Sequence, residues 1–467
     1  MQVELIDEKS INGLRREDYW APALQPFGDE TIDFLNEVSR VLREDKTSRA
    51  YPDVVTFAFW IRKASMLALK GRFMEGYENM AESPSPCHNM SPCLIRFGRG
   101  TVFHIAPSNV PVNYAYSLVT GLVCGNVNIV RIPSKDFPQV DIINSAFFKV
   151  MEESEGFAKY ADYIHLVRYD RSTAINDFFS SVCDVRVIWG GDNTISEIRK
   201  SSLPPRSTEV TFADRYSLAI IDCEMFLAMD DKAKNRLYEE FYNDTFLTDQ
   251  NACTSPRIVV WKKENSDENE KFDKVLASQE VVGQEVVGQE EYVTKAKEEF
   301  WRGFHELVKS RYSYQPIMGV NKLTSALLIA ASNIPCKNVQ DVSAAGGSGS
   351  SISAAGTAVK MEKMPDNLIT RVKLSHVDAS IMELKDNSGY FFEYECDDLM
   401  QLHDLCDDLH CQTIGYLGKR EDILPLLMSG IKGVDRVVPV GKTMDFDFYW
   451  DGYNLFERLT RIIDVKL

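Results

Sequence analysis

The strongest constraint on the fold of this chain is a series of short apolar segments between about residues 100 and 220, with helical patterns between most of them. Such runs of β-branched residues are typical of strands buried on both faces. Strands that alternate with helices form βαβ units, so the pattern predicts an α/β fold with a largely parallel sheet. The expected strands are Val102–Ala106, Val127–Ile132, Ile164–Val167, Val185–Trp189 and Ser217–Ile221.

The rest of the chain adds a helical beginning and a second α/β region. A length of 467 residues is too great for one hydrophobic core and predicts two or three domains. Residues 1–94 are mostly polar, and apolar residues recur at helical spacing around Thr31–Leu42 and Val54–Phe73. After residue 222 we expect a strand at Arg257–Trp261 and a helix at Tyr292–Val308.

The balance of charge excludes whole classes of partner. The chain has 69 acidic and 52 basic side chains, which gives a formal net charge of −17. A surface of this sign repels nucleic acid and anionic membranes. We therefore expect no nucleic-acid partner, and any anionic ligand needs a local basic site.

Cysteine usage and hydropathy favour a cytoplasmic protein without a membrane span. The ten cysteines form no dense framework, and the N-terminal MQVELIDEKS has no apolar signal core. Val110–Val130 contains no charged residue, but Pro111 and several glycines and asparagines interrupt it. Asparagines are costly in lipid, so this stretch is interpreted as a buried helix followed by a buried strand.

Two segments look irregular. Gln279–Glu290 repeats the unit VVGQE and is interpreted as a short duplication in a connection. Ala344–Gly356 is low-complexity and is interpreted as a mobile loop, either native or a cloning scar.

Neither nucleotide nor metal motifs of the familiar kinds are present. The glycines at 346, 347 and 349 lack the dinucleotide spacing, and Gly441-Lys442-Thr443 lacks the glycine that a P-loop needs at Arg436. The cluster His403, Cys406, His410 and Cys411 is expected on one helical face, where one helix cannot surround a tetrahedral ion, so core packing is favoured over zinc. Cys87, His88 and Cys93 form an equally weak zinc candidate in a loop, and we expect no metal.

Cys253 stands in a different context. It lies in the polar sequence Thr248–Arg257 (TDQNACTSPR), between a helix and the expected strand. A thiol at such a junction is presented beside backbone N–H groups, which favour the thiolate and stabilise an oxyanion. An isolated cysteine is more often a packed core residue, and the residue alone does not decide between the two.

Four motifs in order resemble the aldehyde dehydrogenase superfamily. Ile105–Pro111 (IAPSNVP) is similar to its Pro-x-Asn-x-Pro segment, and Ile132–Asp136 (IPSKD) continues the match. Ile188–Thr194 (IWGGDNT) resembles its glycine turn, and Asp249–Cys253 (DQNAC) its Gln-x-x-Cys nucleophile segment. Within the superfamily, the chain is most similar to the fatty-acyl-CoA reductases of bacterial luminescence, from about residue 95 to the C-terminus, especially in 104–138 and 433–454.

The resemblance implies an aldehyde dehydrogenase-like fold and a covalent mechanism. It implies a Rossmann-like NAD(P)-binding domain at 1–221, a catalytic domain with the cysteine nucleophile at 222–435, and a segment 436–467 that packs back. Cys253 is the implied nucleophile, and the Asn109 side-chain amide helps to hold the oxyanion. The implied cofactor-binding residues are Arg131, Ser134, Lys135, Gly190, Gly191 and Thr194.

One departure from the superfamily concerns hydrolysis. The best register places Phe212 where aldehyde dehydrogenases have the glutamate that activates water, with Glu209 and Asp214 nearby. A reductase that releases an aldehyde must avoid hydrolysing its acyl-enzyme, so loss of this base is consistent with reduction.

The expected activity is NADPH-dependent reduction of a fatty acyl thioester to an aldehyde. NADPH is preferred over NADH because Lys135 stands where NAD-preferring relatives have a glutamate. The donor is acyl-CoA or an acylated protein, the implied partner is an acyl-protein synthetase, and a homo-oligomer is expected. Two alternatives stay open: a CoA-acylating aldehyde dehydrogenase that works oxidatively, and an acyl-accepting protein without reductase activity.

Overall fold

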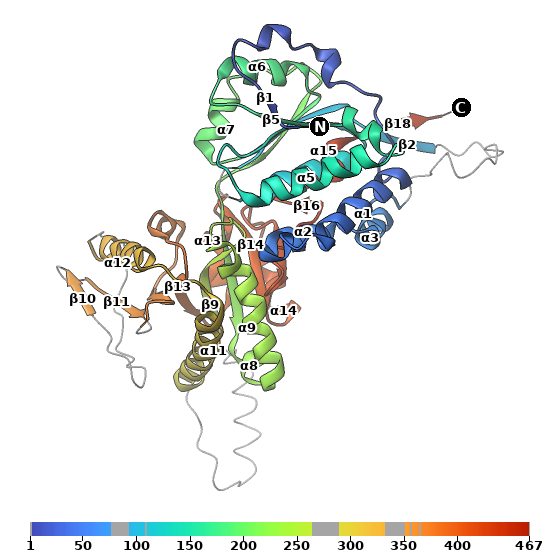
Figure 1. Cartoon of the computed structure of the whole chain (residues 1–467). Helices are drawn as coiled ribbons and strands as arrows, with labels where there is room; N and C mark the ends of the chain where they lie inside the picture. The colour runs from blue at the N-terminus through green and yellow to red at the C-terminus, as the bar shows by residue number, and fades with distance from the viewer. Residues whose placement is uncertain are drawn as a thin grey trace. The chain divides into compact units, whose positions relative to one another are not determined.

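The computed structural model describes residues 2–75, 93–107, 110–263, 289–331, 351–354, 357–363 and 366–466. The chain forms two compact units, unit 1 with residues 1–214 and 446–467, and unit 2 with residues 215–445 (Figure 1). Of the segments expected to be irregular, most of Gln279–Glu290 and of Ala344–Gly356 lies outside the described residues, as do Cys87 and His88.

Unit 1 is built on a six-stranded, all-parallel sheet. Its strands lie in the order β1-β5-β4-β3-β6-β7, and every neighbouring pair is parallel. Four of the five strands expected between 100 and 220 are confirmed here, and β7 was not expected because its sequence, TEVTF, alternates polar and apolar residues. The bounds are β1 Glu4–Leu5, β3 Thr101–Ile105, β4 Val127–Arg131, β5 Ile164–Arg168, β6 Val185–Trp189 and β7 Thr208–Phe212.

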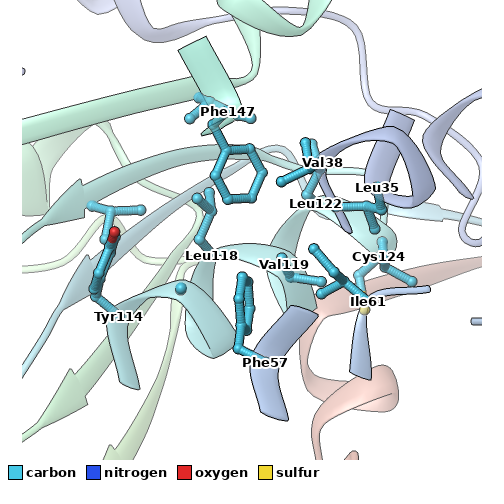
Figure 2. Close-up of a cluster of buried hydrophobic side chains, with 14 of the residues drawn as sticks. Leu35, Val38, Phe57, Ile61, Tyr114, Leu118, Val119, Leu122, Cys124 and Phe147 are labelled. Atoms are coloured by element: carbon cyan, nitrogen blue, oxygen red, sulfur yellow. The ribbon is translucent and has the colours of Figure 1, made fainter. Parts of the chain in front are cut away.

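Two hydrophobic clusters cover the two faces of this sheet, because successive side chains of a strand point to opposite sides. Val102 belongs to the cluster formed with α1, α2, α4 and α5, whereas Phe103 belongs to the cluster formed with α6 and α7. Figure 2 shows the first cluster around α4, where Leu118 and Leu122 lie among Phe57 and Phe147. The helices are α1 Asp29–Glu44, α2 Pro52–Trp60, α3 Lys63–Phe73, α4 Asn113–Val123, α5 Pro138–Glu153, α6 Thr173–Val182 and α7 Asp192–Ile198.

The uncharged stretch 110–130 is confirmed as a buried helix, α4, followed by the buried strand β4. In the described part of the chain, no helix combines the length and the apolar character that crossing a membrane requires. The helical spacing of apolar residues around Val54–Phe73 corresponds to two helices, α2 and α3, which are separated at Ile61 and Arg62.

Unit 2 contains an eight-stranded mixed sheet in the order β10-β11-β12-β13-β9-β8-β14-β15. The pairs β10–β11 and β11–β12 are antiparallel, and the remaining pairs are parallel. Helices α9 and α11 cover one face, and α13 and α14 lie against the other. The strand bounds are β8 Tyr216–Asp222, β9 Pro256–Lys262, β10 Ser351–Ala354, β11 Thr357–Lys363, β12 Thr370–Lys373, β13 Tyr390–Cys396, β14 Cys411–Leu417 and β15 Arg436–Pro439; the helices are α8 Cys223–Leu227, α9 Asp231–Thr245, α11 Gln289–Arg311, α12 Pro316–Ala331, α13 His403–Asp407 and α14 Arg420–Met428.

The boundaries of the units differ from those expected from the sequence. The strand β8 pairs with β9 and β14, so unit 2 begins at Arg215 rather than near residue 222. Residues 436–445 also belong to unit 2, because β15 pairs with β14. Only 446–467 returns to unit 1, where β18 (Thr460–Val465) pairs with β2 (Cys93–Gly98) and the helix α15 (Leu455–Leu459) joins the core.

The expected helix carrying His403, Cys406, His410 and Cys411 is wrong. The helix α13 ends at Asp407, and Cys411 begins β14. Cys406 and Cys411 are fully buried, whereas His403 is half-buried and His410 is exposed, so the four side chains do not converge. Among the described residues, no group of three His, Cys, Asp or Glu side chains is placed to bind a metal ion.

Candidate active site

The candidate cofactor segments of unit 1 follow three neighbouring strands at the same edge of the sheet. β3 lies between β4 and β6, and all three are parallel, so their carboxyl ends meet at one edge. After β3, the strands β4 and β5 are added on one side of it, and β6 and β7 are then added on its other side. The edge of the sheet between β3 and β6 is therefore the topological switch point. Open parallel sheets bind their ligands in the crevice at such a point.

The glycine turn Gly190-Gly191 joins β6 to α7. A Cβ atom on Gly190 would lie 3.0 Å from Cγ2 of Thr194, so glycine allows the turn to close against the first turn of α7. A Cβ on Gly191 would meet nothing nearer than the Cβ of Asp214 at 4.0 Å, and Gly191 and Thr194 are both exposed. The backbone of this turn is therefore open to a ligand.

The buried polar contacts behind the turn also fix its position. Trp189 donates from Nε1 to Oγ of Ser117 at 3.0 Å, and Ser117 lies 2.7 Å from Nδ1 of His104. Since the hydroxyl accepts from Trp189, it donates to His104, whose Nε2–H then donates to Oδ1 of Asn128. Burial lowers the pKa of His104 to about 4, so the ring is neutral.

The candidate cofactor-binding residues at the end of β4 and after it differ in how accessible they are to a ligand. Arg131 is held by Tyr169, with its guanidinium 4.4 Å from the ring centre and a 3.3 Å hydrogen bond to the Tyr169 carbonyl oxygen. Ser134 and Lys135 are exposed, and the Lys135 ammonium lies 5.1 Å from the ring centre of Phe137.

The adjacent acid does not neutralise Lys135. Asp136 is paired with Arg168 at 2.9 Å, and Lys135 makes no ion pair within the described ranges. A cation without a carboxylate partner is suited to a phosphate group.

Phe212 and Glu209 point to opposite faces of the sheet. Phe212 ends β7 and stacks on Trp189 with ring centres 3.6 Å apart. Glu209 is held on the other side by Arg186, whose Nε lies 2.9 Å from its carboxylate, and by Arg199 at 2.7 Å. Both oxygens of the Glu209 carboxylate are thus bonded to guanidinium groups, and Asp214 is exposed beyond the end of the strand. Asn109, the expected oxyanion residue, lies outside the described residues.

In unit 2, Cys253 lies in the turn that leads into β9. It is partly exposed, whereas the other six cysteines whose side chains are described are all buried: Cys124, Cys183, Cys223, Cys396, Cys406 and Cys411. Burial raises the pKa of the Cys183, Cys223 and Cys396 thiols to about 12, which keeps them protonated and unreactive. Within this set, only Cys253 is placed to attack an external carbonyl.

The backbone before Cys253 is unusual. Asp249 and Gln250 are consecutive non-glycine residues with positive φ, 51° and 56°. Such conformations each cost of order 1–3 kcal/mol and persist where surrounding contacts enforce them, often at functional sites. The contacts here are extensive, and they fix the direction in which the Cys253 turn leaves α9.

Gln250 is the main anchor of this turn and was not singled out from the sequence as a structural residue. Its fully buried amide accepts from the N–H groups of Gly389 and Tyr390 at 2.7 and 3.0 Å. Its Nε2 donates to the carbonyl oxygens of Pro256 and Tyr390 at 3.2 and 3.3 Å. Every hydrogen-bonding position of the amide is thus used, and the turn is tied to the start of β13.

Further contacts complete the support. Arg257 donates to Oδ1 of Asn387 at 2.5 Å and to the carbonyl oxygen of Gln250, and Asn387 donates to Oδ1 of Asn251 at 2.8 Å. The carbonyl oxygen of Cys253 itself accepts from Oγ of Ser217 at 2.8 Å. The Cys253 turn is therefore held by β8, β9 and the residues before β13, while the thiol remains partly exposed.

A family model described as acyl-CoA reductase (LuxC) matches residues 31–287, which is more than half of the chain. The chain belongs to the acyl-CoA reductase (LuxC) family. The match begins earlier than the resemblance from residue 95 that the sequence motifs indicated, and it ends before the similar segment 433–454. No curated protein matches the sequence.

Solved structures confirm the aldehyde dehydrogenase-like α/β fold of this LuxC-family chain. An NAD-dependent benzaldehyde dehydrogenase from Corynebacterium glutamicum is similar with a TM-score of 0.54 and 14% identity, over 95% of this chain and 87% of the other. A lactaldehyde dehydrogenase from Escherichia coli has a TM-score of 0.52 and 13% identity, over 94% of this chain and 87% of the other. A salicylaldehyde dehydrogenase from Pseudomonas putida G7 has a TM-score of 0.54 and 15% identity, over 98% of this chain and 87% of the other.

Family and fold together make the LuxC-family chain an oxidoreductase of the group that acts on aldehydes or acyl-CoA.

Proposed function

We propose that this chain reduces a fatty acyl thioester to an aldehyde through an acyl-enzyme on Cys253. The observation that carries the proposal is the accessibility of this thiol in a rigid turn, in contrast to the six buried cysteines. Membership of the acyl-CoA reductase family supplies the substrate class.

The thiolate of Cys253 attacks the thioester carbonyl and forms a new C–S bond, the C–S bond to the donor breaks, and the donor leaves as its thiolate. The oxyanion of this step is held by the backbone N–H of Cys253 and the side-chain amide of Asn109. When bound, a reduced nicotinamide cofactor would supply the hydride that the acyl carbon of this intermediate requires. The C–S bond to Cys253 then breaks, which releases the aldehyde and returns the thiolate.

The environment of Phe212 and Glu209 supports reduction over hydrolysis. Phe212 has no proton-accepting group, and Glu209 is committed to Arg186 and Arg199. Among the described residues of β7, neither Phe212 nor Glu209 is available to activate water for the acyl-enzyme. We expect it to be long-lived without cofactor, and a rapid steady release of free fatty acid from acyl-CoA would contradict this.

NADPH is the proposed cofactor. The open Gly190-Gly191 turn, Thr194 and Ser134 lie at the sheet edge where dinucleotides bind, and Lys135 offers an ammonium that makes no ion pair with any other described residue. Lys135 pairs with the 2′-phosphate in this proposal, and Arg131 contributes positive charge from its position over Tyr169.

The donor is acyl-CoA or an acylated protein, and the proposed protein partners are an acyl-protein synthetase and further copies of the chain. A cytoplasmic location is proposed because the six buried cysteines are free thiols, as is usual in a reducing compartment.

The test is intact-mass analysis after incubation with octanoyl-, dodecanoyl- and hexadecanoyl-CoA in the absence of cofactor. One acyl group should add to the wild-type chain and none to Cys253→Ala, whereas Cys223→Ala, which removes a buried thiol, should be acylated like the wild type. Labelling that survives in Cys253→Ala would overturn the assignment.

Addition of NADPH separates the alternatives. Loss of the acyl mass with formation of aldehyde supports reduction, and an acyl mass that persists would show an acyl-accepting protein. Initial rates with acyl-CoA and NADPH, compared with aldehyde, CoA and NADP, distinguish a reductase from an oxidative enzyme.

A further inference from the structure

The turn Gly441-Lys442-Thr443, which only imitates a P-loop, is held by a buried carboxylate. Asp244 lies on the last turn of α9 and is fully buried. Its Oδ2 accepts from the N–H of Gly441 at 2.5 Å, and its Oδ1 accepts from the N–H of Thr443 at 3.0 Å. Both carboxylate oxygens are thus used to fix one turn.

The turn packs directly on α9 and on β14. Gly441 has a φ of +91°, and a Cβ there would lie 2.2 Å from the Cβ of Glu240, so only glycine fits. On β14, a Cβ on Gly415 would lie 3.2 Å from Cγ2 of Thr443 and 3.9 Å from Oδ2 of Asp244. Two glycines therefore make room for the carboxylate and its turn.

The next residue of the turn reaches the nucleophile loop. Oγ1 of Thr254 donates to Sδ of Met444 at 3.0 Å, and Oγ of Ser255 lies 4.0 Å from the same sulfur. At the other end of the loop, the N–H of Gln250 donates to the carbonyl oxygen of Thr245, the neighbour of Asp244. The contacts close a ring that runs from α9 through the Cys253 turn to Met444 and back to Asp244.

We infer that Asp244 is a positioning residue for Cys253, and that its ionised form holds the turn through which Met444 supports the nucleophile loop. The inference rests on the proposed role of Cys253 and deepens it, because it adds a second ionisation to the acylation step. Asp244 touches neither substrate nor thiol and acts through Met444.

The surroundings of Asp244 favour a titration near neutral pH. Burial raises the pKa of its carboxyl to about 7, and the nearby charge of Asp445 adds to this effect. The other charged groups around it are already paired or bonded: Glu240 with Arg236 on α9, Lys442 with Asp445 on the turn, and Arg436 of β15 with carbonyl oxygens of residues 442, 443 and 445.

Protonation changes what the carboxyl can hold. The ionised group accepts both N–H groups in charge-assisted hydrogen bonds, which are the stronger kind. When one oxygen carries a proton it becomes a donor and no longer accepts well from the N–H that faces it. The turn then loosens, and Met444 supports Thr254 less firmly.

The experiment is the rate of Cys253 acylation between pH 6 and 8, for wild type and Asp244→Asn, with whichever acyl-CoA reacts fastest. Asn is isosteric but neutral at every pH, and with a pKa near 7 about one tenth of Asp244 is ionised at pH 6. The wild type should therefore be up to about tenfold faster than the variant at pH 8, and the two should converge at pH 6. A merely structural role would instead lower the rate by the same factor throughout.

Asp230→Asn is the matched control. Asp230 caps the other end of α9 and accepts from the N–H of Ala233 at 2.7 Å at an exposed position. Its variant should keep the wild-type pH profile. A wild-type profile in Asp244→Asn, or a constant ratio between the two at all pH values, would overturn the inference.

Two further measurements keep the inference testable if Asp244→Asn fails to fold. In the wild type, amide exchange at Gly441 and Thr443, corrected for the intrinsic pH dependence, should be faster at pH 6 than at pH 8. Met444→Ala should keep this pH dependence of amide exchange. It should lose the part of the fall in acylation rate towards pH 6 that protonation of Asp244 causes. Corrected amide exchange that does not depend on pH, or an acylation rate that depends on pH in Met444→Ala as it does in the wild type, would contradict the inference.

Alkylation of Cys253 by iodoacetamide separates this inference from the proposed function. It reads the thiol without any acyl substrate, and it should show the same convergence of wild type and Asp244→Asn at pH 6. If no acyl-CoA reacts but this convergence is seen, the proposed function fails and the positioning role stands.

Discussion

Replacing Gln250 with methionine is the sharpest test of the support behind Cys253. Methionine keeps the length of the side chain but has no amide, so two backbone N–H groups, of Gly389 and Tyr390, and two carbonyl groups lose their partner. A buried group left without a partner costs about 1–3 kcal/mol, and relaxation and entering water recover part of the total. We expect a loss of about 3–5 kcal/mol in the local free energy of opening.

The assay is hydrogen exchange at amides of β13 and β9, because the two units need not unfold in one step. The acylation rate of Cys253 should fall at least about tenfold, since the two left-handed residues before it lose the contacts that enforce them. Gln401→Met is the control, because this glutamine is exposed and only accepts a 3.4 Å contact from Tyr394. A loss below about 1 kcal/mol, with full acylation, would refute the reasoning.

Three more predictions follow from the same geometry. Lys135→Glu should reverse a preference for NADPH over NADH of at least about tenfold in kcat/KM, the equivalent of 1.4 kcal/mol, and an unchanged ratio would remove Lys135 from cofactor recognition. Asn109→Ala should lower turnover on the order of a hundredfold, and a drop under about threefold would place the amide away from the carbonyl. Unfolding of the whole unit moves the Asp244 carboxyl into water, whereas loosening of its turn leaves the carboxyl buried, so the two processes depend on pH in opposite directions. Because its pKa is raised, Asp244 stabilises the fold against unfolding most below its ordinary value of 3.8 and loses this contribution as pH rises through about 7. Urea unfolding should therefore show Asp244→Asn gaining stability relative to wild type between pH 5 and 8, and a difference that does not change with pH would contradict this assignment.

Much of unit 1 could be predicted because strands buried on both faces appear in the sequence as short, mainly apolar runs rich in β-branched residues. β3, β4 and β6 are of this kind, and the helices between them fixed the parallel order. β7 escaped prediction because Thr208, Glu209 and Thr211 alternate with its buried residues, and Glu209 satisfies the buried Arg186 rather than solvent.

The residues that support Cys253 could not be predicted, although Cys253 itself stood out as a candidate nucleophile by its polar turn. Gln250 is bonded to residues about 140 positions away, and Asp244 to residues about 197 positions away. A buried glutamine or aspartate has the same sequence signal as an exposed one, since only its partners distinguish the two. The boundary near residue 214 was missed for a related reason, because β8 looks like the preceding strands and differs only in its pairing.

The return of residues 446–467 to unit 1 has a consequence for synthesis on the ribosome. Unit 2 is one continuous stretch, so its sheet can close as soon as β15 has emerged. Unit 1 must wait, because Phe448, Phe456 and Leu459 complete its core and β18 pairs with β2. The half of the chain that is translated first is therefore the half that finishes folding last, with part of its core exposed to chaperones until the final strand arrives.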